Sequence, residues 1–221
     1  MKKIKTVIFD FDGVIADSLP YHFKQMVEIA RKNFGVKGNE KKIIDEIRTK
    51  SYFELMKTFK ISWTKAPLIL KIIHQARENL FNNIEKIKIF PGTKKLLINL
   101  TKRKLILIIL SSNLEKTINK FIELNKIDYF NQIVCGTNIL GKAVEIESLL
   151  RRNNWKKEEA VYIGDEIRDV EACKKIGMKI IGVSWGFQKA EVLKKHGADY
   201  IAKKPNDILK IIQPLQRLRA P

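Results

Sequence analysis

The stretch Val7-Ile8-Phe9-Asp10-Phe11-Asp12-Gly13-Val14-Ile15 places two carboxylates, two positions apart, where a short apolar run ends. Residues two apart on an extended chain point to the same side, so Asp10 and Asp12 can face one pocket. The alternative is a β-hairpin, because Asp-Gly between two apolar runs is a strong turn signal. A hairpin gives no reason for the acid at Asp10, however, and helical sequence follows Asp17.

Similar apolar runs recur along the chain and are separated by segments of helical period. The runs are continuous rather than alternating in polarity, as expected for parallel strands that are buried on both faces. The alternation of strand and helix favours an α/β fold with a doubly wound, Rossmann-like parallel sheet. We expect strands at 5–9, 105–110, 133–135, 160–163, 180–183 and 200–202, and helices near 93–102, 115–125, 142–153, 169–176, 189–195 and 206–212.

One interval breaks this alternation. Between residues 17 and 88 the sequence shows helical patterns, near 21–32, 41–48, 53–59 and 68–81, and no strand. An insertion of this size directly after the first strand predicts an all-helical cap domain. We therefore divide the chain into a Rossmann-like core, residues 1–16 and 89–221, and a helical cap, residues 17–88.

Two later strand ends also carry polar groups. Ser111-Ser112-Asn113 follows the 105–110 run and leads into a helix. A hydroxyl in that position lies among free N–H groups that suit an anion such as phosphate. The alternative is that these residues only cap the helix.

Gly164-Asp165 ends the 160–163 run, and Asp169 follows four residues after Asp165. Clustered carboxylates supply the oxygen ligands that Mg²⁺ prefers. Alternatively, Asp165 caps the next helix and Asp169 adds a favourable charge to its first turn. Lys142 begins another predicted helix, but a lone lysine in so basic a chain is usually a solvated surface residue.

Taken in chain order, four elements resemble the haloacid dehalogenase-like hydrolase superfamily, and most closely its branch of phosphoglycolate phosphatase-like and β-phosphoglucomutase-like enzymes. They are Asp10-Phe11-Asp12-Gly13-Val14, Ser111, Lys142, and Gly164-Asp165 with Asp169. The resemblance extends through most of the chain, and the helical insertion is similar to the small helical cap of that family.

The resemblance implies roles for these residues. Asp10 would be the nucleophile that forms an aspartyl-phosphate, and Asp12 the general acid and base. Mg²⁺ would be held by Asp10, the backbone carbonyl of Asp12, and Asp165. Ser111, with Ser112 as the alternative, and Lys142 would bind phosphate. Asp169 would orient the metal, with Glu166 adjacent to the ligands, and Gly13 would allow close approach to phosphate. In the cap, Arg48 or Lys50 would contact a second anionic group.

Two of these roles have simpler alternatives, a plain turn glycine for Gly13 and an ordinary surface loop around Arg48 and Lys50.

The resemblance predicts a Mg²⁺-dependent phosphatase acting on a small phosphorylated metabolite. A phosphomutase of the β-phosphoglucomutase type uses the same aspartyl-phosphate chemistry and stays open. Halide release is disfavoured, because that chemistry needs neither the acid at Asp12 nor the Gly-Asp motif.

The net charge raises a different class of function. The chain has 43 Lys and Arg against 24 Asp and Glu, a formal charge of +19. Such an excess is typical of proteins that bind nucleic acids, so a nucleic-acid-binding protein or a polynucleotide phosphatase is an alternative. The basic residues are spread along the chain at polar positions of the predicted helices, which favours a solvated surface that attracts anionic esters.

Composition excludes other classes. Hydrophobic residues make up 45% of the chain, so disorder is excluded. Cys135 and Cys173 are too few and too far apart for a disulfide framework, a CxxC redox pair or a zinc ribbon. An acid at position 10 interrupts the first apolar run, so we expect no secretion signal. The longest aliphatic run, Leu105 to Leu110, is far shorter than the roughly 20 residues needed to cross a bilayer, so we expect no membrane partner. The prediction is a cytoplasmic monomer or homodimer.

Overall fold

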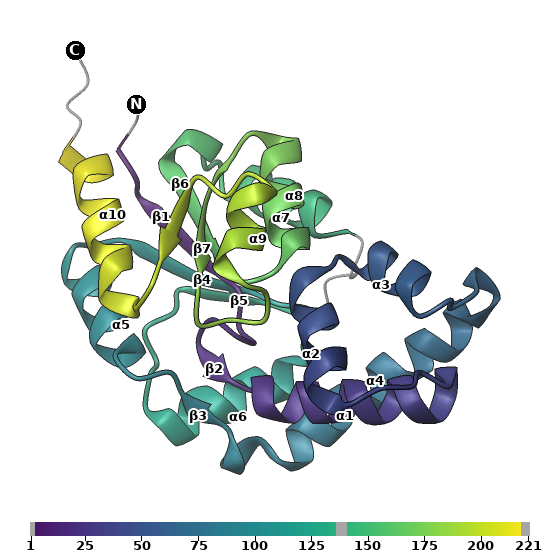
Figure 1. Ribbon diagram of the computed structural model, residues 1–221. Coiled ribbons are helices and arrows are strands. Elements are labelled where there is room, and N and C mark those ends of the chain that lie inside the picture. The colour runs from purple at the N-terminus through teal and green to yellow at the C-terminus, as the bar shows by residue number, and fades with distance from the viewer. Residues whose placement is uncertain (1–2, 136–140, 218–221) are drawn as a thin grey trace.

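The computed structural model describes residues 3–135 and 141–217, with side chains through residue 214. A six-stranded parallel sheet with the order β5-β4-β1-β6-β7-β8 forms its centre (Figure 1). Every strand lies within one residue of its predicted position, so the predicted doubly wound α/β fold is confirmed. The strands are β1 (Thr6–Phe9), β4 (Ile106–Leu110), β5 (Gln132–Val134), β6 (Ala160–Gly164), β7 (Lys179–Val183) and β8 (Tyr200–Ala202).

Helices cover both faces of this sheet, which explains why its strands are continuously apolar. Val7 and Phe9 of β1 pack in a cluster with α5 (Thr93–Lys102), α6 (Glu115–Asn125) and α10 (Pro205–Arg217). Ile8, between them in the chain, packs on the opposite face in a cluster with α7 (Lys142–Arg152), α8 (Ile167–Ile176) and α9 (Ala190–Lys195). The described residues also form short 3₁₀ turns at Trp63–Lys65, Ile84–Lys86 and Lys157–Glu159.

β1 lies between β4 and β6 and pairs with both in parallel, with Phe9 opposite Ile109 and Ile163. The hairpin alternative for the Asp10 loop is therefore wrong, because both edges of β1 are already paired. This register places the residues after β1, β4 and β6 side by side at one edge of the sheet. β4 and β5 lie on one side of β1, and β6, β7 and β8 lie on the other, so the strand order reverses at β1. Open α/β sheets bind ligands at the carboxyl ends of the strands beside such a reversal.

Four helices form a separate group beside the sheet: α1 (Leu19–Phe34), α2 (Glu40–Thr49), α3 (Tyr52–Thr58) and α4 (Ala66–Asn82) (Figure 1). They have a hydrophobic cluster of their own, whose buried members are Val27, Ala30, Ile43, Ile47 and Leu55. The division into core and cap stays a prediction, and this separate cluster supports it.

Two short strands that the sequence did not reveal connect this helical group to the sheet. β2 (Ala16–Asp17) pairs antiparallel with β3 (Lys88–Ile89). The expectation of no strand between residues 17 and 88 is therefore wrong at its two ends, because a two-residue strand is too short to show a period. The pairing of β2 with β3 brings the predicted domain boundaries, 16/17 and 88/89, next to each other.

Two expectations from composition can be compared with the structure. Cys135 and Cys173 are both free thiols, as expected. Within residues 3–135 and 141–217, each helix is too short or too polar to span a lipid bilayer.

Candidate active site

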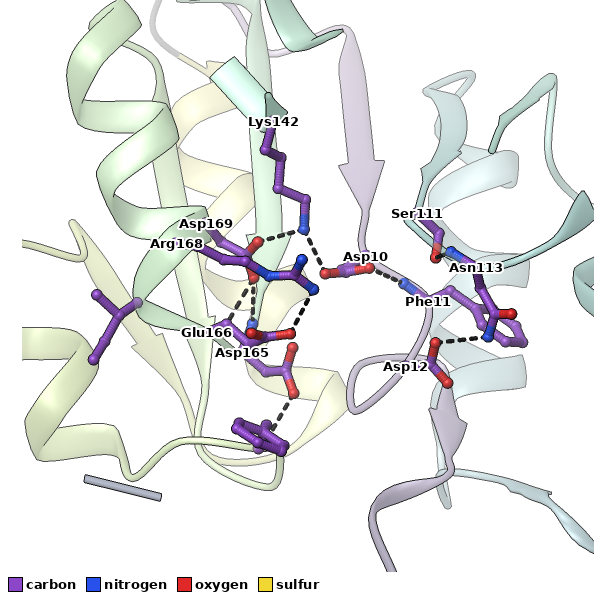
Figure 2. Close-up of polar contacts among 12 residues, drawn as sticks. Asp10, Phe11, Asp12, Ser111, Asn113, Lys142, Asp165, Glu166, Arg168 and Asp169 are labelled. Carbon is purple, nitrogen blue, oxygen red and sulfur yellow. Dashed lines mark hydrogen bonds and ion pairs between the residues drawn. The ribbon is translucent and has the colours of Figure 1, made fainter. Parts of the chain in front are cut away.

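Lys142 is buried between two carboxylates, one directly after β1 and one in the first turn of α8 (Figure 2). Its Nζ donates to Asp10 Oδ2 at 2.6 Å and also to Asp169 Oδ1. Only 3% of Lys142 is exposed, so the expectation of an ordinary solvated lysine is wrong at this position. The ammonium is buried because two acids pair with it, which offsets the cost of removing it from water.

The pKa values of this pair reflect opposing effects. Burial raises the pKa of Asp10 to about 6, although Lys142 acts to lower it. Burial acts to lower the pKa of Lys142, but the charges of Asp10 and Asp169 outweigh it and raise that pKa. Lys142 therefore keeps its positive charge at neutral pH, when Asp10 is ionised.

Asp12 has a different environment from Asp10. Its Oδ1 accepts hydrogen bonds from Ser18 Oγ at 2.6 Å and His22 Nε2 at 3.3 Å, and its Oδ2 accepts one from Asn113 Nδ2 at 2.9 Å. Burial acts to raise the pKa of Asp12, but the hydrogen bonds and charge of His22, with Ser18 and Asn113, hold it below the ordinary value. Asp12 lies toward Asn113, away from Lys142 (Figure 2).

Ser111 follows β4 and is 1% exposed, and its Oγ accepts a hydrogen bond from the Asn113 backbone at 3.1 Å. It lies across Asp10 from Lys142 (Figure 2). Leu114, not Ser111 or Ser112, is the N-cap of α6. The alternative that these serines only cap the helix is therefore wrong. Ser112 is less buried, and the choice between the two serines for phosphate binding stays a prediction.

Asp169 fixes the start of α8. Its Oδ2 accepts hydrogen bonds from the backbone N–H groups of Asp165 and Glu166, both at 3.1 Å, while its Oδ1 accepts one from Lys142. Glu166, and not Asp165, is the N-cap of α8. The Asp165 side chain is therefore not used as a helix cap, contrary to the simpler alternative.

The carboxylates of Asp10, Asp165 and Glu166 form a cluster whose ligand atoms lie within 4.8 Å of one another. Asp165 Oδ2 accepts a hydrogen bond from Phe187 N at 2.7 Å, but Asp165 Oδ1 is buried without a hydrogen-bond partner among the described residues. Burial, with the charges of Glu166 and Asp10, raises the pKa of Asp165 well above its ordinary value.

A hard divalent cation fits this cluster, because it would bind the free Asp165 oxygen and offset the repulsion between the acids. Glu166, expected only beside the metal ligands, lies within the cluster itself. Its carboxylate also accepts hydrogen bonds from Arg168 at 2.7 Å and from Tyr52 of α3 at 3.3 Å. The side chain of Asp12 is not part of this cluster, and metal ligation by its backbone carbonyl stays a prediction.

Two glycines enclose Asp165. Gly13 has a φ of +72°, and a Cβ at that position would lie 1.9 Å from Asp165 Oδ2. A Cβ on Gly186 would lie 2.2 Å from Asp165 Cβ. Gly13 is therefore required for its close approach to Asp165, whereas its predicted approach to phosphate stays a prediction.

The two predicted cap residues already have partners in the protein. Arg48 donates to the backbone carbonyls of Phe187 at 3.1 Å and Gly186 at 3.3 Å. Lys50 Nζ lies 2.5 Å from Glu46 Oε2 and 2.8 Å from Thr58 Oγ1. Contact between these side chains and substrate stays a prediction.

A cleft of about 410 Å³ lies between α3 and the first turns of α7 and α8. Its lining combines apolar side chains with cations and two acids, and includes Lys50, Tyr52, Phe53, Lys142, Glu166, Arg168, Glu171 and Phe187. A cleft of this size suits a small ligand, and Lys142, which lines it, donates to Asp10 at 2.6 Å.

Sequence reasoning missed several residues that shape the site. Ser18, His22 and Gln188 stand in no recognisable motif, and Ser18 and His22 contact Asp12 only after α1 folds back on the loop. Asn113 lies in the quoted Ser-Ser-Asn motif, but its bond to Asp12 spans 101 positions and could not be read from spacing.

Comparisons with known proteins agree with this geometry. The model of the family described as "Haloacid dehalogenase-like hydrolase" matches residues 7–183. A phosphoglycolate phosphatase from Synechococcus elongatus is 32% identical over 97% of this chain and 100% of its own. A putative pyrophosphatase from Caldanaerobacter subterraneus is 25% identical over 96% of both chains.

A solved structure has the same fold. The crystal structure of a predicted phosphatase from Clostridium acetobutylicum superposes with a TM-score of 0.77, covers 96% of this chain and 100% of its own, and is 24% identical in sequence. The family match covers most of the chain, and the motifs that suggested the resemblance meet at one sheet edge. This chain belongs to the haloacid dehalogenase-like hydrolase family.

Proposed function

We propose that this protein is a Mg²⁺-dependent phosphatase that hydrolyses a small phosphorylated metabolite through an aspartyl-phosphate. One observation carries the proposal: two aspartates on one loop have opposite environments. Asp10 lies beside Lys142 and the acidic cluster, whereas Asp12 is held apart by Ser18, His22 and Asn113. Carboxylates with contrasting environments are suited to separate roles, here nucleophile and proton carrier.

In the first step, a carboxylate oxygen of Asp10 attacks phosphorus and the bond to the leaving oxygen breaks, while Asp12 donates a proton to that oxygen. In the second step, Asp12 takes a proton from water, which attacks phosphorus and releases inorganic phosphate from Asp10. Ser111 and Lys142 would donate hydrogen bonds to the non-bridging oxygens. Asp12 is ionised at neutral pH in the free protein, and the negative charge of bound phosphate would raise its pKa for the first step.

Asp10, Asp165 and the Asp12 backbone carbonyl would hold Mg²⁺, which when bound neutralises charge on the carboxylates and the phosphoryl group. The unpartnered Asp165 oxygen and the raised pKa values of Asp10 and Asp165 support this assignment. Lys142 and Asp169 keep Asp10 and the first turn of α8 in place. Tyr52, Arg168 and Phe187 face the same cleft, so they would surround the part of the substrate beyond its phosphate.

Relatives named phosphoglycolate phosphatase and pyrophosphatase support a small phosphorylated substrate. The test is a panel of phosphoglycolate, pyrophosphate, sugar phosphates, nucleotides and a phosphorylated oligonucleotide, each with Mg²⁺ and with chelator. We expect Mg²⁺-dependent release of phosphate from at least one small ester. Isomerised sugar phosphate would favour the phosphomutase instead, and preference for the oligonucleotide would favour the polynucleotide alternative.

Asp10→Asn tests the nucleophile, and Asp128→Asn, at an exposed position of the core, is its control. We expect the first variant to lose at least about 10³-fold in kcat and the second to match the wild type. Full activity of Asp10→Asn would overturn the proposed mechanism.

A further inference from the structure

Residues 186–189, here called the 186–189 segment, contact Asp165 on one side and the cap on the other. On the core side, Phe187 N donates to Asp165 Oδ2 at 2.7 Å, and Gln188 N donates to the Asp165 carbonyl at 3.1 Å. Because Gly186 has no Cβ, the segment can pack closely against the Asp165 side chain, where a Cβ would lie 2.2 Å from Asp165 Cβ. Any shift of this segment therefore moves hydrogen-bond donors of Asp165.

On the cap side, Arg48 makes three hydrogen bonds to the same segment. Its guanidinium donates to the carbonyls of Phe187 at 3.1 Å and Gly186 at 3.3 Å, and its own carbonyl accepts from Lys189 N at 3.1 Å. The guanidinium also lies 5.8 Å from the ring centroid of Phe23, which stacks on Phe187 at 5.1 Å. Arg48 thus joins the end of α2 to the loop that holds Asp165.

Gln188 strengthens this connection from inside the core. It is 3% exposed, its Nε2 donates to the Lys50 carbonyl at 2.8 Å, and its Oε1 accepts from the backbone N–H of Ile167 at the start of α8. Asp45 of α2 adds an ion pair at 2.5 Å to Lys189 Nζ. The cap loop, the 186–189 segment and the helix that follows Asp165 are therefore linked by short polar contacts.

We infer that Arg48 is a positioning residue for the carboxylate of Asp165, acting through the 186–189 segment rather than by touching substrate. When the cap is seated on this segment, Phe187 N holds Asp165 Oδ2 and leaves Oδ1 directed to the cluster. Seating of the cap and binding of a divalent cation should then favour each other by the same factor, because linkage between two sites is reciprocal. This inference rests on the proposed function, in which Asp165 is a metal ligand.

The test is Mg²⁺ binding measured by titration calorimetry without substrate, comparing wild type with Arg48→Met. Methionine keeps the apolar stem over Phe23 and removes both guanidinium bonds. We expect Mg²⁺ affinity to fall about 3- to 10-fold, and Arg48→Lys to recover part of the loss. Arg31→Met is the matched control, because Arg31 also donates to a backbone carbonyl, that of Gly38 at 3.1 Å, but within the cap.

Hydrogen exchange of the intact protein gives a second readout. We expect Mg²⁺ to slow exchange of the Lys189 amide and of the cap loop near Lys50 in the wild type and in Arg31→Met, and to do so less in Arg48→Met. The same measurement without Mg²⁺ shows whether the variant is folded. If Arg48→Met does not fold, the same comparison is made with Arg48→Lys, which must then show the weaker binding.

Equal Mg²⁺ affinity and equal protection in folded Arg48→Met would overturn the inference and leave the proposed function standing. Failure of the wild type to bind Mg²⁺ would instead overturn the metal assignment of the proposed function, and this inference with it. Reduced phosphatase activity without reduced Mg²⁺ affinity would assign Arg48 to substrate contact and would also overturn the inference.

Discussion

Lys142 Nζ lies 2.6 Å from Asp10 Oδ2, although the two residues are 132 positions apart in the chain. The contact forms because α7 starts beside the end of β1, and both side chains are almost completely buried. The same ammonium also pairs with Asp169, so one lysine offsets the charge of two buried acids. Removing it would leave both acids without their cation.

We therefore expect Lys142→Met to lower kcat/KM by about 10²–10³-fold and the free energy of unfolding by about 3–5 kcal/mol at pH 7.5. Chemical denaturation and steady-state kinetics measure the two effects. Lys174→Met is the control, because Lys174 pairs with Asp199 at the surface and should contribute at most about 1 kcal/mol. Equal effects of the two variants would contradict the assigned role of Lys142.

Burial of Asp10 predicts that its charge destabilises the metal-free protein. Its pKa is raised from 3.8 to about 6, so the folded state binds the proton more tightly than the unfolded state. Proton binding to Asp10 therefore stabilises the folded state. This stabilisation is fully present below pH 3.8 and is lost as the pH rises through about 6.

In chelator at pH 7.5, Asp10→Asn should consequently raise the free energy of unfolding by about 1–2 kcal/mol, and the gain should shrink toward zero near pH 4. Urea denaturation across this pH range is the measurement. Asp128→Asn, at an exposed position, is the control variant. A gain that grows as the pH falls would have the wrong sign and would refute the account.

The hydrogen bond from Ser18 to Asp12 predicts a shift in the pH profile. Ser18 is fully buried, and its side chain makes no helix-capping bond, so Ser18→Ala mainly removes the 2.6 Å bond to Asp12. Loss of a donor to the ionised form raises the pKa of Asp12. The acid limb of kcat should move to higher pH, with kcat falling about 3- to 10-fold. Ser62→Ala, whose hydroxyl accepts hydrogen bonds from Thr64, should leave the profile unchanged.

Gly13 and Gly35 form a matched pair for testing the space around Asp165. Both have positive φ values, +72° and +64°, but a Cβ on Gly35 meets nothing within 4 Å, whereas one on Gly13 overlaps Asp165 Oδ2. Gly35→Ala should cost about 1 kcal/mol of stability and leave kcat/KM unchanged. Gly13→Ala should in addition abolish Mg²⁺ binding in calorimetry. Retention of wild-type Mg²⁺ affinity by Gly13→Ala would show that Asp165 is not held as described.

Ser111 and Ser112 can be separated by single substitutions. Ser111 is buried beside Asp10, so Ser111→Ala should lower kcat/KM about 10- to 100-fold through the loss of one hydrogen bond to a charged phosphoryl group. Ser112→Ala should change kcat/KM by less than about twofold. The reverse order would move the phosphate contact to Ser112.

The sequence alone predicted most of the fold, because its signals are local. Continuous apolar runs identified all six strands of the main sheet within one residue, since strands buried on both faces leave no polar position. The pair Asp10 and Asp12 and the Gly164-Asp165 motif could be recognised from spacing. The two-residue strands β2 and β3 could not, because they are too short to have a period.

The tertiary structure decided the contacts between residues that are far apart in the chain. No local pattern shows that Lys142 is buried, that Asn113 and Ser18 hold Asp12, or that Arg48 contacts the 186–189 segment. The sequence determined which chemical groups stand at the strand ends. Only the parallel pairing of β1 with β4 and β6 brought those ends together, because adjacent parallel strands end at the same edge of the sheet. The helices that connect the strands then bury the charged groups that meet there.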